Sequence, residues 1–262
     1  MRTLLIDADM LLFRTMTSLE VDCDMGDEVW IRYADIGSVR ETFWKHLEVM
    51  KKHFQSDSLL LFWTGPSAFR RRIFPEYKAN RAGMKKPVGW TRMKRELLEE
   101  EVSYLHDEIE ADDWLGIYAS ALVNADEDFV IVSGDKDLDQ IPGVHHWPWK
   151  EEQTWTITHD QAERQFYRQI LVGDSTDNIP GCAGVGAITA ERIVSKFNIA
   201  EPVECWEEIV QQFEKALKKK NDLRDATEVA TLQARLVRIL RATEYDVLDR
   251  TVDLWTPPTL KS

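Results

Sequence analysis

The chain has 262 residues, 44% of them hydrophobic and 30% charged, which suits one or two globular units and excludes a fibrous or disordered polymer. Its 33 Lys and Arg against 46 Asp and Glu give a net charge of −13, which excludes a surface that binds nucleic acid or anionic lipid everywhere. Asp7 and Asp9 interrupt the start where a signal peptide needs apolar residues, and no apolar run approaches a membrane span. Three cysteines lack metal-type spacing, so we expect neither a disulfide framework nor a zinc site. We therefore predict a cytoplasmic protein without a membrane partner.

Short apolar runs alternate with helical patterns in the first half of the chain. The runs have the length and the branched or aromatic content of buried strands, and they lie at 3–6, 59–63 and 129–133. Apolar residues at helical spacing predict helices over 38–54 and 112–124. This alternation predicts an α/β fold with a mostly parallel twisted sheet flanked by helices.

The pattern becomes helical beyond residue 165. We predict helices over 213–223 and 228–243, after glycine-rich turns at Gly173 and 181–186. The chain therefore divides into an α/β domain at 1–165 and a helical lobe at 166–262.

Carboxylates gather beside strand ends and glycine turns. They are Asp7, Glu110, Asp112, Asp113, Asp135, Asp137, Asp174 and Asp177. Ligands of parallel sheets collect at the carboxyl ends of the strands, and carboxylates brought together repel one another unless cations lie between them or some are protonated. Oxygen donors without paired His or Cys favour Mg²⁺ or Mn²⁺. For Asp9, Asp113 and Asp139, the alternative of an N-cap or turn residue stays open.

One segment of this acidic chain is strongly basic. Residues 69–95 hold ten Lys or Arg against the single acid Glu76, a net charge of +9. Phosphate-binding cations interleaved with Phe69, Tyr77 and Trp90 are typical of a site for single-stranded or frayed nucleic acid. The alternative is a solvated helix face.

Glycines surround a predicted tight turn at 184–186, ahead of a helix that starts near Ala187. Gly184 and Gly186 allow the backbone to approach a phosphate, and the amides that open the helix can bind it without reading sequence. The alternative is a helical hairpin packed for its own sake.

Six stretches of the chain resemble, in order and spacing, the 5′→3′ exonuclease and flap endonuclease family. They lie at 5–9, 75–81, 110–113, 133–138, 173–181 and 184–186. The resemblance covers about residues 1–200. Residues 85–89 and 238–240, with 253–255, are most similar to the stand-alone bacteriophage 5′→3′ exonucleases of this family.

The resemblance implies a PIN-like nuclease domain at 1–165 with a helical arch at about 66–100. It also implies a DNA-binding lobe at 166–262 with a helix-three-turn-helix at about 170–198, often around K⁺. It implies that Asp7, Glu110 and Asp112 hold a first metal ion, and that Asp135, Asp137 and Asp177, with Asp174 nearby, hold a second. Asp113 is a further candidate metal ligand.

The resemblance further implies roles for basic, aromatic and glycine residues. Lys78 and Arg81 would reach the scissile phosphate, and Tyr77 would stack on a terminal base. The remaining DNA contacts would come from Arg70, Arg71, Arg72, Lys85, Lys86, Gly184, Val185 and Gly186. The family usually carries another Asp at the end of the 59–63 strand, where this sequence has Trp63 or Thr64.

We expect the protein to use two metal ions to hydrolyse phosphodiester bonds of DNA, and of RNA in RNA–DNA hybrids. The products should carry 5′-phosphates. We expect the protein to be a monomer. One alternative is a phosphatase of the haloacid dehalogenase type, since Asp7, Asp9, Thr64 and 134–139 match its motifs in part. Another is a DNA-structure-binding protein whose catalysis is impaired by the change at Trp63 and Thr64. Replication partners are not indicated.

Overall fold

The computed structural model describes residues 2–66, 68–100 and 102–259. Met1, Ser67, Glu101 and 260–262 fall within the predicted domains but lie outside the described residues. The chain forms two compact units that are discontinuous in sequence. The first unit takes 1–67, 83–134 and 143–155, and the second takes 68–82, 135–142 and 156–262. The predicted domain boundary near residue 165 stays a prediction.

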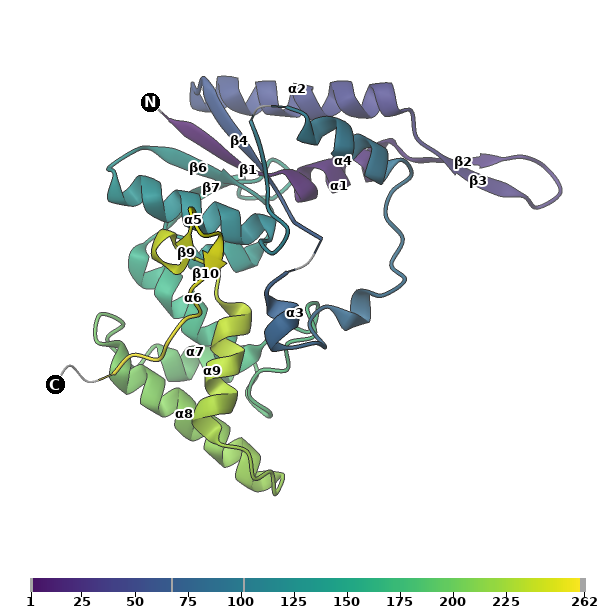
Figure 1. Cartoon of the computed structure of the whole chain (residues 1–262). Coiled ribbons are helices and arrows are strands. Elements are labelled where there is room, and N and C mark those ends of the chain that lie inside the picture. The colour runs from purple at the N-terminus through teal and green to yellow at the C-terminus, as the bar shows by residue number, and fades with distance from the viewer. Residues whose placement is uncertain (1, 67, 101, 260–262) are drawn as a thin grey trace. The chain divides into compact units, whose positions relative to one another are not determined.

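The first unit contains most of the strands (Figure 1). In chain order its elements are β1 (Thr3–Asp7), α1 (Ala8–Leu19), β2 (Val21–Asp24), β3 (Trp30–Tyr33), α2 (Ile36–Phe54), β4 (Ser58–Trp63), α4 (Trp90–Leu98), β5 (Ser103–Leu105), α5 (Ala111–Asn124), β6 (Phe129–Val132) and β7 (Gly143–His146). The strand β8 (Thr154–Ile157) starts in the first unit and ends in the second.

The central sheet has the strand order β5-β4-β1-β6-β7-β8. The pairs β1–β4, β1–β6, β4–β5 and β6–β7 are all parallel, and Leu5 of β1 lies between Leu60 of β4 and Ile131 of β6. The mainly parallel sheet and the three predicted strands are confirmed. The predicted helices are confirmed too, as α2 and α5.

Helices cover both faces of this sheet (Figure 1). The alternation of side chains along a strand sends Trp63 to the face under α1, α2 and α4, where it is fully buried with Leu4 and Ile6. Phe62 points to the opposite face and stacks on Trp114 of α5. This pleat explains why the runs are apolar throughout, because each strand is buried on both sides.

A β-hairpin that the sequence did not predict joins α1 to α2. The strands β2 and β3 are antiparallel, with Val21 opposite Tyr33 and Cys23 opposite Ile31. Figure 1 shows this ribbon extending beyond the helices of the first unit. Val21, Ile31 and Tyr33 are about half exposed.

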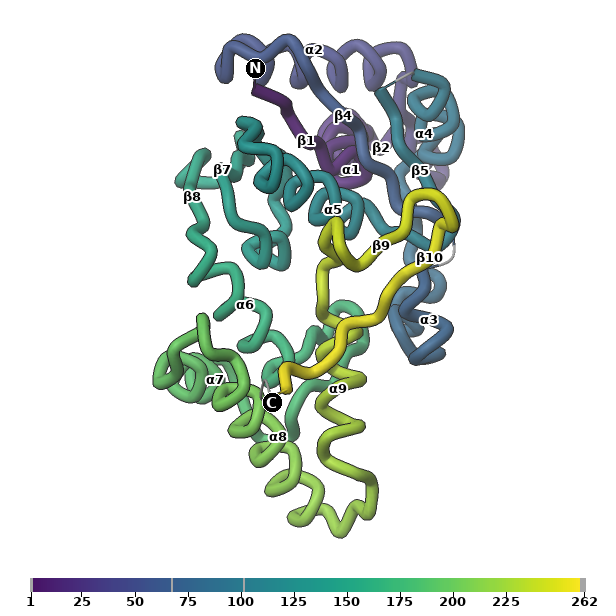
Figure 2. Tube along the Cα trace, turned by 60° about the vertical axis from the view of Figure 1, so that its left-hand side comes forward, coloured from purple at the N-terminus to yellow at the C-terminus, as the bar shows by residue number. Residues whose placement is uncertain are grey.

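The second unit is largely helical (Figure 2). Its elements are α3 (Arg70–Ile73), the 3₁₀ helices η1 (Ala79–Arg81), η2 (Lys136–Gln140) and η3 (Ala242–Glu244), α6 (His159–Val172), α7 (Ala187–Val194), α8 (Pro202–Lys219), α9 (Ala226–Val237), β9 (Tyr245–Asp246) and β10 (Thr251–Val252). Phe166, Trp206 and Phe213 lie in its core, and Trp255 of the C-terminal segment packs edge-on against Phe166 and Trp206. None of the helices in the described part of the chain combines the length and the apolar character needed to cross a membrane.

The predicted ends of two helices in this unit are wrong. The helix expected at 213–223 begins at Pro202, which is favourable in a first turn, and ends at Lys219. The helix expected at 228–243 ends at Val237. Its carbonyls at Leu236 and Val237 accept hydrogen bonds from side chains elsewhere in the unit, which replace the backbone donors of a further turn.

The basic segment 69–95 does not form one element. Residues 68–82 belong to the second unit, with α3 and η1, and the remainder belongs to the first unit, where α4 begins at Trp90. The alternative interpretation of this segment, a single solvated helix face, is therefore wrong. The position of an arch over a site stays a prediction.

Candidate metal and nucleic-acid site

The first turn of α5 holds one acidic group. A carboxylate oxygen from each of Glu110, Asp112 and Asp113 lies within 4.8 Å of the others. Glu110 is the N-cap, and Asp113 accepts a hydrogen bond from the Glu110 backbone N–H at 3.4 Å, so the two form a capping box. Glu110 and Asp113 are buried, while Asp112 is partly exposed. Closely spaced, buried carboxylates fit a hard divalent cation, which would relieve their repulsion.

Asp7 lies at the carboxyl end of β1 in the same unit. Its Oδ1 accepts from the Met10 backbone N–H at 3.0 Å, which makes it the N-cap of α1, and its Oδ2 accepts from the Ser133 hydroxyl at 2.8 Å. The side chain is buried. Each carboxylate oxygen has a second lone pair, so the capping role leaves Asp7 capable of binding metal.

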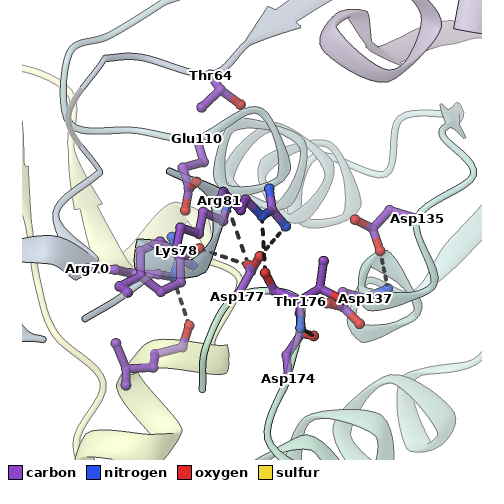
Figure 3. Close-up of polar contacts among 12 residues, drawn as sticks. Thr64, Arg70, Lys78, Arg81, Glu110, Asp135, Asp137, Asp174, Thr176 and Asp177 are labelled. Carbon is purple, nitrogen blue, oxygen red and sulfur yellow. Dashed lines mark hydrogen bonds and ion pairs between the residues drawn. The ribbon is translucent and has the colours of Figure 1, made fainter. Parts of the chain in front are cut away.

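The second unit holds the other acidic group (Figure 3). Burial, followed by the charges of Asp135, Asp174 and Asp177, raises the pKa of Asp137 to about 7. Asp135 caps η2 by accepting from the Asp137 backbone N–H at 2.9 Å, and Asp174 accepts from the Thr176 N–H at 2.8 Å. The charges of Asp135, Asp174 and Asp177 thus oppose the ionisation of Asp137, which a divalent cation would reverse. That this group and the α5 group share one pair of ions stays a prediction.

We expect the contribution of Asp137 to the stability of the metal-free protein to be lost as the pH rises from about 4 to about 7. The native Asp137 carboxyl holds a proton that the unfolded chain, with an ordinary value of 3.8, releases. This contribution is complete below the unfolded pKa and is lost as the pH rises through the native one. Urea unfolding with chelator at pH 4.5 and 7.5 measures it. Between these two pH values, the unfolding free energy of Asp137→Asn should change more favourably than that of the unaltered protein, and that of Asp160→Asn should change equally. Equal changes in all three proteins would contradict the assignment.

The two cations predicted to reach the phosphate lie beside Asp177 (Figure 3). Lys78 Nζ is 3.4 Å from Asp177 Oδ2, and Arg81 forms an ion pair with Oδ1. The Lys78 backbone N–H also donates to the Asp177 carbonyl at 2.9 Å, and the Asn80 amide donates to the Ser175 carbonyl at 2.9 Å. Motifs almost 100 residues apart in the chain are therefore held side by side.

Tyr77 has a different environment from the one expected of a base-stacking residue. Its side chain is 3% exposed in the core of the second unit, and its hydroxyl donates to Asp177 at 3.1 Å. Stacking on a terminal base would require the ring to leave this core, so that role stays a prediction.

Arg70 does not fit the predicted DNA contact. It is 2% exposed, and its guanidinium donates to the carbonyls of Leu236 at 2.8 Å and Arg238 at 2.6 Å. These carbonyls at the end of α9 need donors, because no further helical turn supplies them. The other predicted contacts Arg71, Arg72, Lys85 and Lys86 are exposed.

We expect Arg70→Met to lower the free energy of unfolding by about 2–4 kcal/mol, because it leaves buried carbonyls without their charged donor. The DNA affinity of the folded fraction should not change. Urea unfolding and fluorescence anisotropy with labelled duplex measure the two quantities. Arg71→Met is the matched control, since its side chain is exposed, and it should leave stability unchanged. A loss of affinity without a loss of stability in Arg70→Met would restore the DNA-contact role.

The end of β4 lacks a carboxylate. Trp63 is fully buried in the core, where its Nε1 donates to the Ser103 hydroxyl at 3.1 Å, so it cannot take the place of an acid that faces a site. The Thr64 hydroxyl oxygen accepts from the Ala111 backbone N–H at 3.1 Å, in the first turn of α5. Thr64 is thus the residue of the pair that lies beside the acidic group.

The predicted glycine turn precedes α7 as expected. Gly184 has φ of +85°, and a side chain at Gly184 or Gly186 would meet nothing within 4 Å, so the turn is open to a ligand. Gly186 is the N-cap of α7, and Val185 is partly exposed. Upstream, Gly173 has φ of +70° and a Cβ there would lie 2.3 Å from the Ile179 carbonyl, which explains the glycine in the 173–181 loop.

Two site neighbours were missed by the sequence reasoning. Gln169 of α6 donates to Asp137 Oδ1 at 2.7 Å, and Lys94 of α4 lies 2.7 Å from Asp9 Oδ1. Gln169 is 6% exposed, and its only sequence signal is a polar residue on an otherwise apolar helix face. Lys94 was counted with the basic segment, and nothing in its local sequence separates it from its neighbours.

The chain thus combines an α/β unit that carries a group of closely spaced carboxylates with a helical unit that carries glycine turns. The model of the 5′-3′ exonuclease N-terminal resolvase-like domain matches residues 2–167, and that of the 5′-3′ exonuclease C-terminal SAM fold matches 160–257. The chain belongs to the 5′-3′ exonuclease family and is a nuclease, a hydrolase. The resemblance to this family is confirmed, and the phosphatase alternative has no support.

Two curated phage proteins are similar over almost the whole chain. The exodeoxyribonuclease of Enterobacteria phage T3 is 31% identical, covering 97% of this chain and 92% of its own length. The exonuclease of Escherichia phage T7 is 30% identical, covering 97% and 93%. A solved structure of T5 5′-exonuclease with divalent metal ions (zinc) bound has the same fold, with a TM-score of 0.64 at 17% identity over 90% of this chain and 89% of that one.

Proposed function

We propose that the chain hydrolyses phosphodiester bonds of DNA from 5′ ends and at 5′ flaps, with two divalent metal ions, and releases 5′-phosphorylated products. The observation that carries this proposal is the group of Glu110, Asp112 and Asp113, whose ligand atoms lie within 4.8 Å of one another. The structure of T5 5′-exonuclease, which has the same fold and contains bound divalent metal ions, also supports the proposal.

The donor set is all-oxygen, which favours Mg²⁺ or Mn²⁺. Asp7 and the α5 group would hold one ion, and Asp135, Asp137, Asp174 and Asp177 would hold the other. When bound, the ions supply activation of water and stabilisation of the leaving 3′-oxygen. The protein's part is to hold these carboxylates in place, and their positions as helix caps orient Asp7, Glu110 and Asp135.

Lys78 and Arg81 would bind the scissile phosphate. Both are paired with Asp177 in this structure, so each has a fixed position before substrate arrives. A divalent ion at Asp177 would compete for its oxygens and release donors to the phosphate. Preorganised donors of this kind stabilise charge that grows on phosphoryl oxygens.

Duplex binding would use backbone and exposed cations. The open turn at 184–186 and the first amides of α7 suit a phosphate, and Arg71, Arg72, Lys85 and Lys86 offer charge without reading sequence. K⁺ at the helix-three-turn-helix, action on RNA–DNA hybrids, a monomeric state and work in the cytoplasm of an infected host belong to the same proposal. The T3 and T7 relatives support a phage setting.

The experiment incubates 5′-labelled duplex, nicked, flap and RNA–DNA hybrid substrates with the protein, with and without Mg²⁺. We expect Mg²⁺-dependent degradation from the 5′ end. A phosphatase should remove one 5′-phosphate from each product. DNA binding without Mg²⁺-dependent degradation would favour the alternative of a binding protein with impaired catalysis, which the missing acid at Thr64 motivates.

A further inference from the structure

A lysine of the first unit is bound at the end of β4. Lys94 Nζ lies 2.7 Å from Asp9 Oδ1 and 2.9 Å from the Thr64 carbonyl oxygen. Its side chain is 19% exposed and that of Asp9 is 20% exposed, and Nζ lies 5.3 Å from the centre of the Trp63 ring. Removing two charges from water costs free energy that their attraction need not repay, so stability alone is a weak reason for such a pair.

Asp9 and Lys94 together satisfy the backbone of Thr64. Asp9 Oδ2 accepts from the Thr64 N–H at 2.6 Å, while Lys94 donates to the Thr64 carbonyl. The remaining polar group of Thr64, its hydroxyl, accepts from the Ala111 N–H at 3.1 Å. The N–H, carbonyl and hydroxyl of one residue therefore connect α1, α4 and the first turn of α5.

The next residue, Gly65, brings the end of β4 still closer to the segment that precedes α5. The Gly65 N–H donates to the Ile109 carbonyl at 3.0 Å. A Cβ on Gly65 would lie 1.9 Å from the His106 carbonyl oxygen, so only glycine permits this approach. The end of β4 is thus bonded to the chain on both sides of Glu110.

These contacts end where the carboxylates of α5 begin. Glu110 is the N-cap of α5, and Asp112 and Asp113 lie in its first turn, so the direction of that turn sets the direction of all three side chains. An acid at the end of β4 would add a ligand to this group. Here the position carries Thr64, which instead holds α5 in place.

We propose that Lys94 and Asp9 are positioning residues that hold Thr64, and through it the first turn of α5, so that Glu110, Asp112 and Asp113 bind a divalent cation without an acid at the end of β4. The inference rests on the metal binding proposed above. It assigns to an internal ion pair the geometric task of fixing the ligands, and it leaves the chemistry to the carboxylates.

The test measures Mn²⁺ binding to the metal-free full-length protein without DNA, from the electron paramagnetic resonance signal of free Mn²⁺. Loss of a residue that orients metal ligands costs about 10–100-fold in affinity, and we expect this for Lys94→Met, Asp9→Asn and Thr64→Val. The Lys94→Met/Asp9→Asn double variant should lose no more than either single variant, because the residues act as one unit. Cleavage at saturating Mn²⁺ should recover toward the unaltered rate.

Matched variants separate positioning from folding. Lys51→Met removes another paired lysine of the first unit, on α2, and should leave the affinity unchanged. Lys94→Arg keeps the charge and the donors and should restore part of the affinity. Thr64→Val, similar in size and shape to threonine, decides the question where circular dichroism shows that Lys94→Met is unfolded.

The outcomes distinguish this inference from the proposed function. Unchanged Mn²⁺ affinity in Lys94→Met and Thr64→Val, with normal binding by the unaltered protein, would overturn the positioning role and leave the nuclease proposal intact. Failure of the unaltered protein to bind Mn²⁺, together with no effect of Glu110→Gln on cleavage, would overturn both the positioning role and the proposed function. Additive losses in the double variant would also overturn the single-unit positioning role.

Discussion

We expect the Lys78→Ala variant to cleave 5′-labelled duplex DNA about 10²–10³-fold more slowly than the unaltered protein, the usual effect of losing one preorganised donor. The fold should persist, because the Tyr77 hydroxyl and Arg81 still bind Asp177. Duplex affinity should change little, since many other cations remain. Single-turnover kinetics at saturating protein, together with anisotropy measured in Ca²⁺, separate the rate from binding.

Lys218→Ala is the control for this variant. Lys218 also belongs to the second unit and also pairs with a carboxylate, that of Glu214, but its side chain is 72% exposed. The control should cleave at the unaltered rate. A Lys78→Ala variant with the same single-turnover rate as this control would remove Lys78 from the reaction.

The second large effect is expected for Asp135→Asn. A metal ion stabilises transition-state charge by several kcal/mol, so loss of a ligand should slow cleavage by about 10²–10⁴-fold. The asparagine keeps an oxygen that can accept from the Asp137 N–H, so η2 and its cap should remain. Cleavage rates across a Mn²⁺ titration, with circular dichroism as the check on folding, measure the effect.

Asp160→Asn supplies the comparison. Asp160 is more than half exposed and pairs with Arg164 within α6, away from the predicted ligands in the sequence. It should retain the full rate. If Asp135→Asn cleaves as fast as Asp160→Asn at every Mn²⁺ concentration, Asp135 is not a metal ligand.

Local patterns were sufficient wherever a neighbour in the sequence supplies the physical cause. The strands β1, β4 and β6 were predictable because apolar residues on both faces of a strand leave a continuous run. The helix α5, expected over 112–124, was predictable because apolar residues recur along it at helical spacing. In the turn before α7, Gly184 has φ of +85°, a conformation that favours glycine.

Other features depended on partners far along the chain. Arg70, Arg71 and Arg72 are identical in chemistry, and only the packing of α3 against the end of α9 buries the first and exposes the others. The predicted end of α9 was wrong for the same reason, because the last carbonyls of the helix accept hydrogen bonds from the side chains of Arg70 and Gln140. Side chains that bond over more than 90 residues leave no local pattern.

By itself the sequence determined the parallel sheet, the family and the candidate acidic ligands, because apolar runs and closely spaced carboxylates are patterns of residues that are neighbours in the chain. Only the tertiary structure decided which cationic side chain forms an ion pair with which carboxylate. It gave Lys78 and Arg81 to Asp177, and Lys94 to Asp9, among ten similar charges in one segment. The physical reason is that an ion pair depends on distance and burial, and both are set by the packing of segments that the chain order keeps apart.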